Sequence, residues 1–290
     1  MNLIDCHTHS TNSPDGYDAP EAMILEAVSK GICAYALTDH CEINRWFRRG
    51  HYRNTELSCN PQDTYDFAHD FETAMEDNIR LKEKYSGKIE LISGIELGQA
   101  QFDFGLAAAV SSDARLDFTI ASLHQIKGYD DFAFTDYTEN DPAAMVGQYY
   151  REMLEVCRKG SFDILGHLTY PLRYIEGNNN IKINMTENDE IICEIFRTLI
   201  ERGKGIEINT SGLRQKFGKT FPDMKYLKMY RQMGGDIISV GSDAHRCEDI
   251  GAGIKEGIEL AAEAGFKYLS IFKNHKVKAI SLCSQLTVNS

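Results

Sequence analysis

The sequence predicts an α/β fold built on a parallel sheet and contained in one domain. Strand-like runs alternate with amphipathic helical patterns along most of the chain, which is typical of parallel sheets that are either doubly wound or closed into a barrel. Several strand-like runs are nearly continuous in apolar residues, as expected for strands that are covered on both faces. The 290 residues contain neither a Pro- or Gly-rich linker nor an internal repeat. A single domain spanning residues 1–290 is therefore expected.

Seven runs are expected to form strands, because each is short and rich in β-branched or other apolar side chains. They are residues 2–6, 33–38, 89–95, 117–122, 162–166, 205–209 and 237–241. Helices are expected at residues 20–31, 65–85, 142–159, 187–203, 222–234 and 253–265. The first helical run, PEAMILEAVSKG, begins with a proline and ends with a glycine, the usual asymmetry of helix ends. The longest interruption, residues 41–88, is rich in charged and aromatic residues and is expected to be an insertion that forms a lid over the strand ends.

Composition and charge exclude several classes of function. The chain has 31 Lys and Arg against 43 Asp and Glu, a formal net charge of −12, which argues against a general nucleic-acid binder. An anionic substrate stays compatible with this charge, because a bound metal ion reverses the local field. No secretory leader and no apolar run of the ~20 residues that span a bilayer is seen, so we expect a cytoplasmic location without a membrane partner. The eight cysteines form no C-x-x-C pair, so reduced thiols are expected.

Histidine and carboxylate residues recur where the predicted strands end. His7 and His9 are one residue apart, and an extended backbone places both side chains on one face. The others that follow a strand, or lie in the loop after the first one, are Asp15, His40, Glu96, His124, His167, Asp243 and His245. A lone histidine at a strand end is usually structural, but the C-terminal ends of parallel strands gather at one rim. The joint pattern predicts a polynuclear metal site, whereas His51, His69 and His275 are expected to be surface or structural residues.

The chemistry of this residue set favours metal-assisted phosphoryl transfer. Imidazole and carboxylate ligands without thiolates suit zinc, iron or manganese. Two or more such ions can activate a water molecule and clamp the oxygens of a transferring phosphoryl group. The motifs of competing functions are absent: no G-x-G-x-x-G follows the first strand, and neither a P-loop nor a G-x-S-x-G nucleophile elbow occurs.

Six motifs in a fixed order carry a family resemblance. DCHTHS, ALTDH, GIELG, ASLH, GH and GSDAH, in this order, resemble the polymerase-and-histidinol-phosphatase (PHP) family over nearly the whole chain. The length, Asp15 and the INTSGLR stretch at 208–214 are similar to the monofunctional histidinol-phosphate phosphatases of that family. The resemblance implies a distorted seven-stranded (β/α)7 barrel and hydrolysis of L-histidinol phosphate, a small phosphorylated metabolite, in histidine biosynthesis. The alternatives are a PHP-type phosphoesterase acting on another phosphomonoester or a nucleotide, and a catalytically silent metal-binding module.

The resemblance further implies three divalent transition-metal ions, which are zinc, iron or manganese. The implied ligands are His7, His9, Glu96 and Asp243 for the first ion, Glu96, His124 and His167 for the second, and Asp15, His40 and His245 for the third. Some branches have a histidine in place of Asp15, which keeps a ligand there and bears on metal preference. A metal-activated hydroxide would attack phosphorus in line. Asp15, His40 and His245 are expected to take part in catalysis, and the leaving group would receive its proton from Asp15, an imidazole or water.

Substrate contacts are less well indicated by the sequence. Arg173 and Arg214 follow strand ends and are expected to bind phosphate through charge-assisted hydrogen bonds. The alternative for each is a surface arginine paired with a carboxylate. Within the insertion, Glu42, Trp46 and Phe47 are candidates for contacting an amine and an imidazole, or else for packing on the barrel rim. The oligomeric state stays open.

Overall fold

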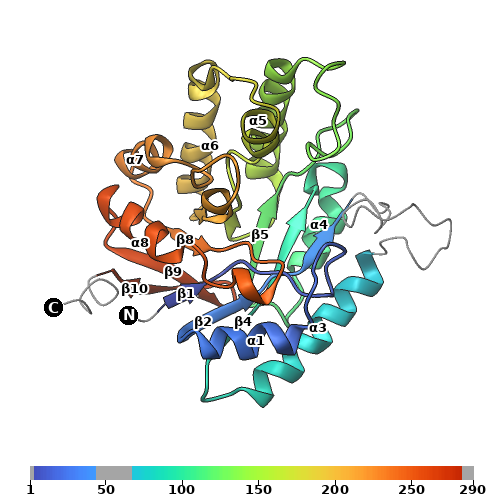
Figure 1. Cartoon of the computed structure of the whole chain (residues 1–290), viewed down its shortest axis with the longest axis vertical. Helices are drawn as coiled ribbons and strands as arrows, with labels where there is room; N and C mark the ends of the chain where they lie inside the picture. Colours follow the sequence, from blue (N-terminus) through green and yellow to red (C-terminus); the bar gives the residue numbers. More distant parts are fainter. Residues whose placement is uncertain (1–2, 44–66, 283–290) are drawn as a thin grey trace.

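The computed structural model describes residues 3–43 and 67–282, and its centre is one parallel sheet (Figure 1). The strands are β1 Leu3–Asp5, β2 Ile32–Leu37, β3 His40–Glu42, β4 Glu90–Gly98, β5 Phe118–Ser122, β6 Ile164–Leu165, β7 Gly205–Asn209 and β8 Ile238–Gly241. Their order is β1-β2-β4-β5-β6-β7-β8, and β3 also pairs with β4 in parallel. Only Thr38 and Asp39 separate β2 from β3, so these two strands occupy one position around the sheet. The seven predicted strands are confirmed.

The sheet curves until its first and last strands meet. The backbone N–H of Cys6 donates to the carbonyl of Val240 at 3.0 Å, and the N–H of Asp243 donates to the carbonyl of His7 at 2.8 Å. Further along, the N–H of His9 donates to the carbonyl of Ala244 at 2.8 Å. These bonds join β1 and β8 into a nearly closed barrel, as expected.

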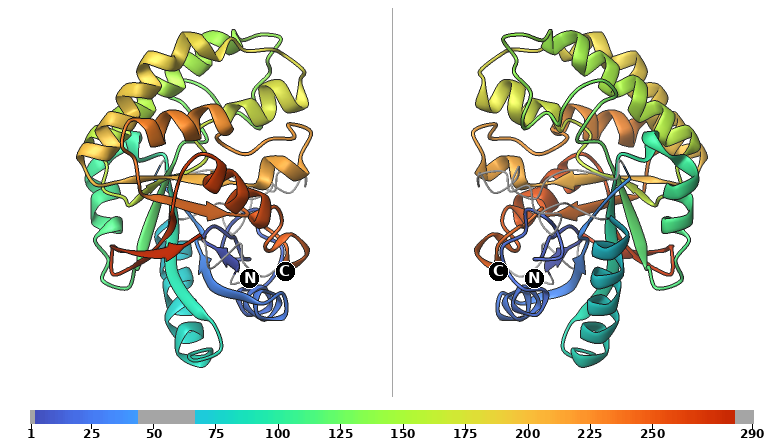
Figure 2. Two further views of the ribbon diagram at one scale, coloured as in Figure 1. Left: turned by 90° about the vertical axis from the view of Figure 1, so that its left-hand side faces the viewer. Right: turned by 90° about the vertical axis from the view of Figure 1, so that its right-hand side faces the viewer.

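Seven α-helices of the described residues lie outside the strands (Figures 1 and 2). They are α1 Pro20–Ser29, α3 Phe67–Lys84, α4 Phe104–Ser111, α5 Pro142–Lys159, α6 Asp189–Glu201, α7 Met224–Gln232 and α8 Ile254–Glu263. Shorter helical turns span Ala100–Phe102, Arg173–Asn178, Met185–Asn188, Ser211–Arg214 and Cys247–Asp249. Local chemistry explains several helix starts: the Asp141 side chain caps α5 by accepting from the N–H groups of Ala143 and Ala144, and Pro142 occupies its first turn. Only α4 was not expected, because its short sequence FGLAAAVS lacks a polar face.

The predicted insertion at 41–88 is only partly described. Its first residues pair with β4 as part of β3, and its last part is α3, which packs on β3 and β4. Phe71 and Met75 of α3 join the apolar layer between barrel and helices, so α3 belongs to that layer. The lid itself stays a prediction, since residues 44–66 lie outside the described residues.

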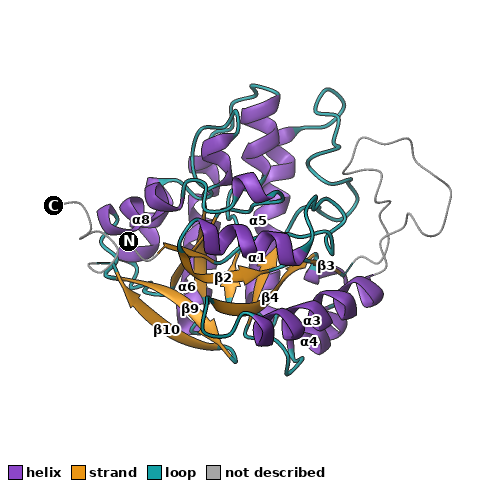
Figure 3. Ribbon diagram, turned by 60° about the horizontal axis from the view of Figure 1, so that its bottom comes forward, coloured by secondary structure: helices purple, strands orange, loops and turns teal. Residues whose placement is uncertain are grey.

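A C-terminal hairpin fills the end of the barrel opposite the metal-ligand motifs (Figure 3). Strands β9 Tyr268–Lys273 and β10 Lys276–Ser281 are antiparallel, and the sequence analysis did not anticipate them. Ile271 and Phe272 pack among apolar barrel residues, with the Phe272 ring stacked 5.5 Å from that of Phe118. The turn residues Asn274 and His275 adopt φ values of 47° and 59°, a conformation that usually calls for glycine, so the sequence carries only a weak turn signal.

The helices of the described residues can be compared with what a membrane-spanning helix requires. None of their helices combines the length and the apolar character needed to cross a bilayer.

Candidate active site

The structure brings every predicted ligand residue to one rim of the barrel. His7 and His9 follow β1, His40 begins β3, Glu96 lies in β4, and the remaining side chains come from loops after β1, β5, β6 and β8. Seven of these residues are buried, whereas the side chains of Asp15 and His245 keep 18% and 24% of their exposure. The rim therefore has a buried floor and an open edge.

The first group has two nitrogens and two carboxylate oxygens close together. His7 Nε2 lies 3.0 Å from His9 Nε2, and Glu96 Oε2 lies 3.3 Å from each of them. Asp243 Oδ1 lies 3.4 Å from His9 Nε2 and 3.8 Å from His7 Nε2. Two imidazoles and two carboxylates are thus brought together.

The second group shares Glu96 with the first. Glu96 Oε1 lies 2.7 Å from His167 Nε2 and 3.2 Å from His124 Nε2, while these two nitrogens are 3.3 Å apart. Since each oxygen of Glu96 faces a different group, its carboxylate has the arrangement of a bridging ligand.

The third group forms the open edge. Asp15 Oδ2 lies 3.1 Å from His245 Nε2, and Asp15 Oδ1 lies 3.5 Å from His40 Nε2. The ring of His9 stacks on the rings of His40 and His245, with centroids 4.3 and 4.2 Å apart. His40 Nδ1 is also 3.0 Å from Glu96 Oε2, so the third group adjoins the other two.

Electrostatics within the cluster favour bound positive charge. Burial is the largest influence on each group and disfavours its charged form. Even so, the carboxylates of Glu96 and Glu42 raise the pKa of His124 to about 10. The surrounding imidazoles likewise hold the pKa of Glu96 well below its ordinary value, against the effect of burial. His9 differs, because burial and two neighbouring imidazoles lower its pKa to about 3. Burial also lowers the pKa of His167. The pKa values of His7, His40, His124 and His245 are raised by neighbouring carboxylates, so protons on these four imidazoles neutralise carboxylates where cations would do so.

Two buried carboxylates lie behind the ligands, a position that the sequence analysis predicted for neither of them. Glu207 of β7 places Oε1 2.6 Å from His7 Nδ1, and Glu42 places Oε1 3.0 Å from His124 Nδ1. Glu42 was a candidate for contacting the substrate amine, but the structure sets it behind His124 and outside the pocket lining. For Glu207 a signal existed: a carboxylate inside the apolar strand GIEIN is as unusual as Glu96 in GIELG. Trp46 and Phe47, the other candidates, lie outside the described residues.

The two predicted phosphate-binding arginines occupy different places. Arg173 lines the pocket above the cluster together with Tyr170 and Tyr174. Its Nη2 donates to Asp243 Oδ2 at 2.9 Å, and its guanidinium stacks 5.2 Å from the Tyr170 ring centre. Arg214 instead donates to the main-chain carbonyls of Ser242 and Asp243, at 2.6 and 2.8 Å, and is absent from the pocket lining. Arg173 therefore faces the pocket, whereas Arg214 holds the loop that carries Asp243.

Comparisons with known proteins find similarity to histidinol-phosphatases over nearly the whole chain. A probable histidinol-phosphatase of Thermotoga maritima is 32% identical over 270 residues, which cover 93% of this chain and 95% of that protein. The histidinol-phosphatase of Lactococcus lactis is 26% identical over 287 residues, 96% of this chain and 97% of that protein. A crystal structure of histidinol phosphate phosphatase from Lactococcus lactis, complexed with zinc, L-histidinol and phosphate, has a TM-score of 0.75, 26% identity, and coverage of 96% of this chain and 99% of that one.

The family assignment rests on a match to most of the chain. The sequence model of the PHP domain matches residues 5–211. Asp243 and His245 lie beyond the matched residues, and the barrel brings them to the other ligands. The chain belongs to the PHP domain family.

Proposed function

We propose that this chain is a metal-dependent phosphomonoesterase that hydrolyses L-histidinol phosphate to L-histidinol and phosphate in histidine biosynthesis. The observation that carries the proposal is the convergence of imidazole and carboxylate donors from six strand ends beside Arg173. Nearly full-length similarity to histidinol-phosphatases supports the substrate. The zinc, L-histidinol and phosphate in the Lactococcus lactis structure support it as well.

The ligand groups fit divalent transition-metal ions. Each group offers mixed nitrogen and oxygen donors, a chemistry that suits zinc, iron or manganese. In the first group the two nitrogens lie 3.0 Å from each other and 3.3–3.8 Å from the carboxylate oxygens. We assign three ions, held by the three groups described above, and the zinc of the Lactococcus lactis enzyme supports zinc among them. Bound ions would supply the positive charge that activates water as the nucleophile and neutralises the phosphoryl oxygens.

Arg173 is the residue that we assign to the phosphate. Its guanidinium is already held by an anion, the Asp243 carboxylate, and is oriented by the Tyr170 ring and by a 2.7 Å bond to Ser211 Oγ. Its Nε–H is buried without a hydrogen-bond partner among the described residues. An arginine held in this way can bind phosphate with little loss of side-chain freedom. Arg214 supports the site indirectly, because it holds the loop that carries Asp243.

Protonation of the leaving group is assigned to the open edge. Asp15, His40 and His245 form the only ligand group that includes partly exposed side chains among the described residues. A leaving alkoxide that departs toward solvent would meet these side chains first. The remaining candidate donor is a water molecule in the same place.

A small substrate fits the charge of the molecule. Because the protein has a net charge of −12, it would repel a nucleic acid everywhere except at the immediate site. A cationic leaving group such as histidinol is favoured by the same charge. The cytoplasmic location stays a prediction.

Phosphate release from a panel of phosphomonoesters tests the proposal. The metal-loaded protein should have its highest kcat/KM on histidinol phosphate among histidinol phosphate, glycerol phosphate and nucleoside monophosphates. Equal or higher efficiency on a nucleotide would move the assignment to another phosphoesterase. Bound ions without phosphate release from any substrate would indicate the silent metal-binding module.

A further inference from the structure

Glu207 connects two of the three ligand groups from behind. It lies in β7, which contributes none of the predicted ligands, and its side chain is 1% exposed. Its Oε1 lies 2.6 Å from His7 Nδ1 in the first group. Its Oε2 accepts a 2.9 Å hydrogen bond from the backbone N–H of His167 in the second group, and a weaker one from Asn209 Nδ2 at 3.3 Å.

The bond to His7 decides which ring nitrogen can bind a cation. An ionised carboxylate only accepts hydrogen bonds, so Nδ1 of His7 must carry the hydrogen. Once a bound cation displaces the second proton of the imidazolium, the lone pair lies on Nε2, which faces His9 and Glu96 at 3.0 and 3.3 Å. A carboxylate behind a ligating histidine also raises the basicity of the imidazole.

The contact between Glu207 and His7 has room because the neighbouring residue, Gly241, has no side chain. Gly241 of β8 lies so close that a Cβ there would sit 2.3 Å from His7 Cβ and 2.7 Å from Glu207 Oε1.

Two other ligands have neutral partners at Nδ1: Ser13 Oγ at 3.2 Å for His9, and the Asp243 carbonyl at 3.0 Å for His245. The partner of His7 is charged and closer.

We propose that Glu207 is a positioning residue that fixes the ring orientation and the tautomer of His7 for the first ion. It touches neither the pocket nor the reacting atoms, and it acts through His7 and the backbone of His167. The inference rests on the metal binding in the proposed function. In Glu207→Gln the amide can donate to His7 Nδ1, which would move the hydrogen to Nε2 and block that ligand.

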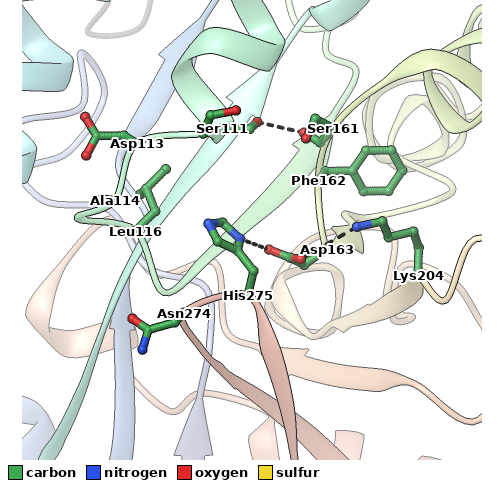
Figure 4. A pocket seen from close by; sticks show the side chains of 11 residues that line it. Ser111, Asp113, Ala114, Leu116, Ser161, Phe162, Asp163, Lys204, Asn274 and His275 are labelled. Atoms are coloured by element: carbon green, nitrogen blue, oxygen red, sulfur yellow. Dashed lines mark hydrogen bonds and ion pairs between the residues drawn. The ribbon is translucent and has the colours of Figure 1, made fainter.

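The chain contains a matched control at the other end of the barrel (Figure 4). Asp163 Oδ2 lies 2.7 Å from His275 Nδ1, and the Asp163 side chain is 6% exposed. This pair repeats the carboxylate–imidazole contact of Glu207 and His7, but it opens on a cavity formed by α4, the hairpin turn and the residues before β6 and β7. Asp163→Asn removes the same charge and leaves the three ligand groups intact.

Zinc binding to the metal-free full chain decides the inference. In competition with a chromophoric chelator, Glu207→Gln should lower the affinity for one Zn²⁺ ion by roughly 10- to 100-fold. The Asp163→Asn variant should bind Zn²⁺ with wild-type affinity. Glu207→Asp, which keeps the charge but is one methylene too short to reach His7, should shift affinity in the same direction and serves if the Gln variant does not fold. Melting of the metal-free variants separates this role from a merely structural one, which would lower the melting temperature and leave Zn²⁺ affinity unchanged.

Two results would overturn the inference. One is wild-type Zn²⁺ number and affinity in the folded Glu207 variants. The other is an equal loss of affinity in Asp163→Asn. Wild-type protein that binds Zn²⁺ but does not hydrolyse histidinol phosphate contradicts only the proposed function, and the comparison of variants still decides the role of Glu207.

Discussion

Glu96→Gln is the single ligand substitution expected to damage the site most. Its carboxylate serves two groups: Oε1 lies 2.7 Å from His167 Nε2, and Oε2 lies 3.3 Å from both His7 and His9. Glutamine has the same shape but replaces one oxygen by an NH₂ group, which only donates. Whichever way the amide turns, one group receives a donor in place of a ligand, and both groups lose the negative charge.

The expected loss follows from this double role. Changing a residue behind a metal ligand typically costs 10- to 100-fold in affinity or activity, and replacing a ligand itself should cost at least as much. With two groups affected, kcat/KM on histidinol phosphate should fall by at least ~100-fold, which corresponds to about 2.7 kcal/mol. Elemental analysis after dialysis should also find fewer bound ions per chain. Glu152→Gln is the matched control, because Glu152 bonds to Gln101, Lys127 and Gln148 away from the ligand groups.

The reasoning would be refuted by a folded Glu96→Gln protein with an unchanged ion content and near-normal turnover. A thermal melt of the metal-free variant checks the fold independently. If the variant kept its ions but lost turnover, the carboxylate would serve catalysis without bridging.

Three other predictions concern the substrate, the arginines and pH. Steady-state kinetics should give histidinol phosphate a kcat/KM at least ~10-fold above that of a monoester with a neutral leaving group, about 1.4 kcal/mol of transition-state binding; equal values would remove the role of the cationic leaving group. Arg173→Ala should reduce kcat/KM for both substrates alike, by an amount near the ~1.5–3 kcal/mol of a charged hydrogen bond; a selective loss on one substrate would place Arg173 at the leaving group. Arg214→Ala should first lower the affinity for the metal ions, because Arg214 holds the Asp243 loop. Burial raises the pKa of Asp131 from 3.8 to about 6, so its contribution to stability is present below pH 3.8 and is lost as the pH rises through 6. Asp131→Asn should therefore gain stability relative to wild type between pH 4 and pH 7 in urea titrations with chelator, and a constant difference would contradict the shift.

The periodic elements and the ligand set were predictable because their signals are local. Apolar runs such as IELISGI and the helix boundaries of PEAMILEAVSKG depend on residues within one element. His7 and His9 could be assigned to one face because the backbone alternates. The gathering of strand ends at one rim is a general property of parallel sheets, so the remaining ligands needed no knowledge of particular contacts.

The remaining features of the site depend on contacts between residues that are far apart in the sequence. Glu207 and His7 are 200 positions apart in the sequence, and no periodic pattern links them before the barrel closes β1 against β8 and brings them to 2.6 Å. The sequence predicted a phosphate contact for both Arg173 and Arg214, yet the path of the chain after each strand turns Arg173 toward the pocket and Arg214 toward the Asp243 loop. The sequence by itself therefore determined which elements form and which side chains reach the rim, since these follow from local periodicity. Only the tertiary structure decided which carboxylates stand behind the ligands and which arginine faces the pocket, because those contacts depend on how the barrel closes.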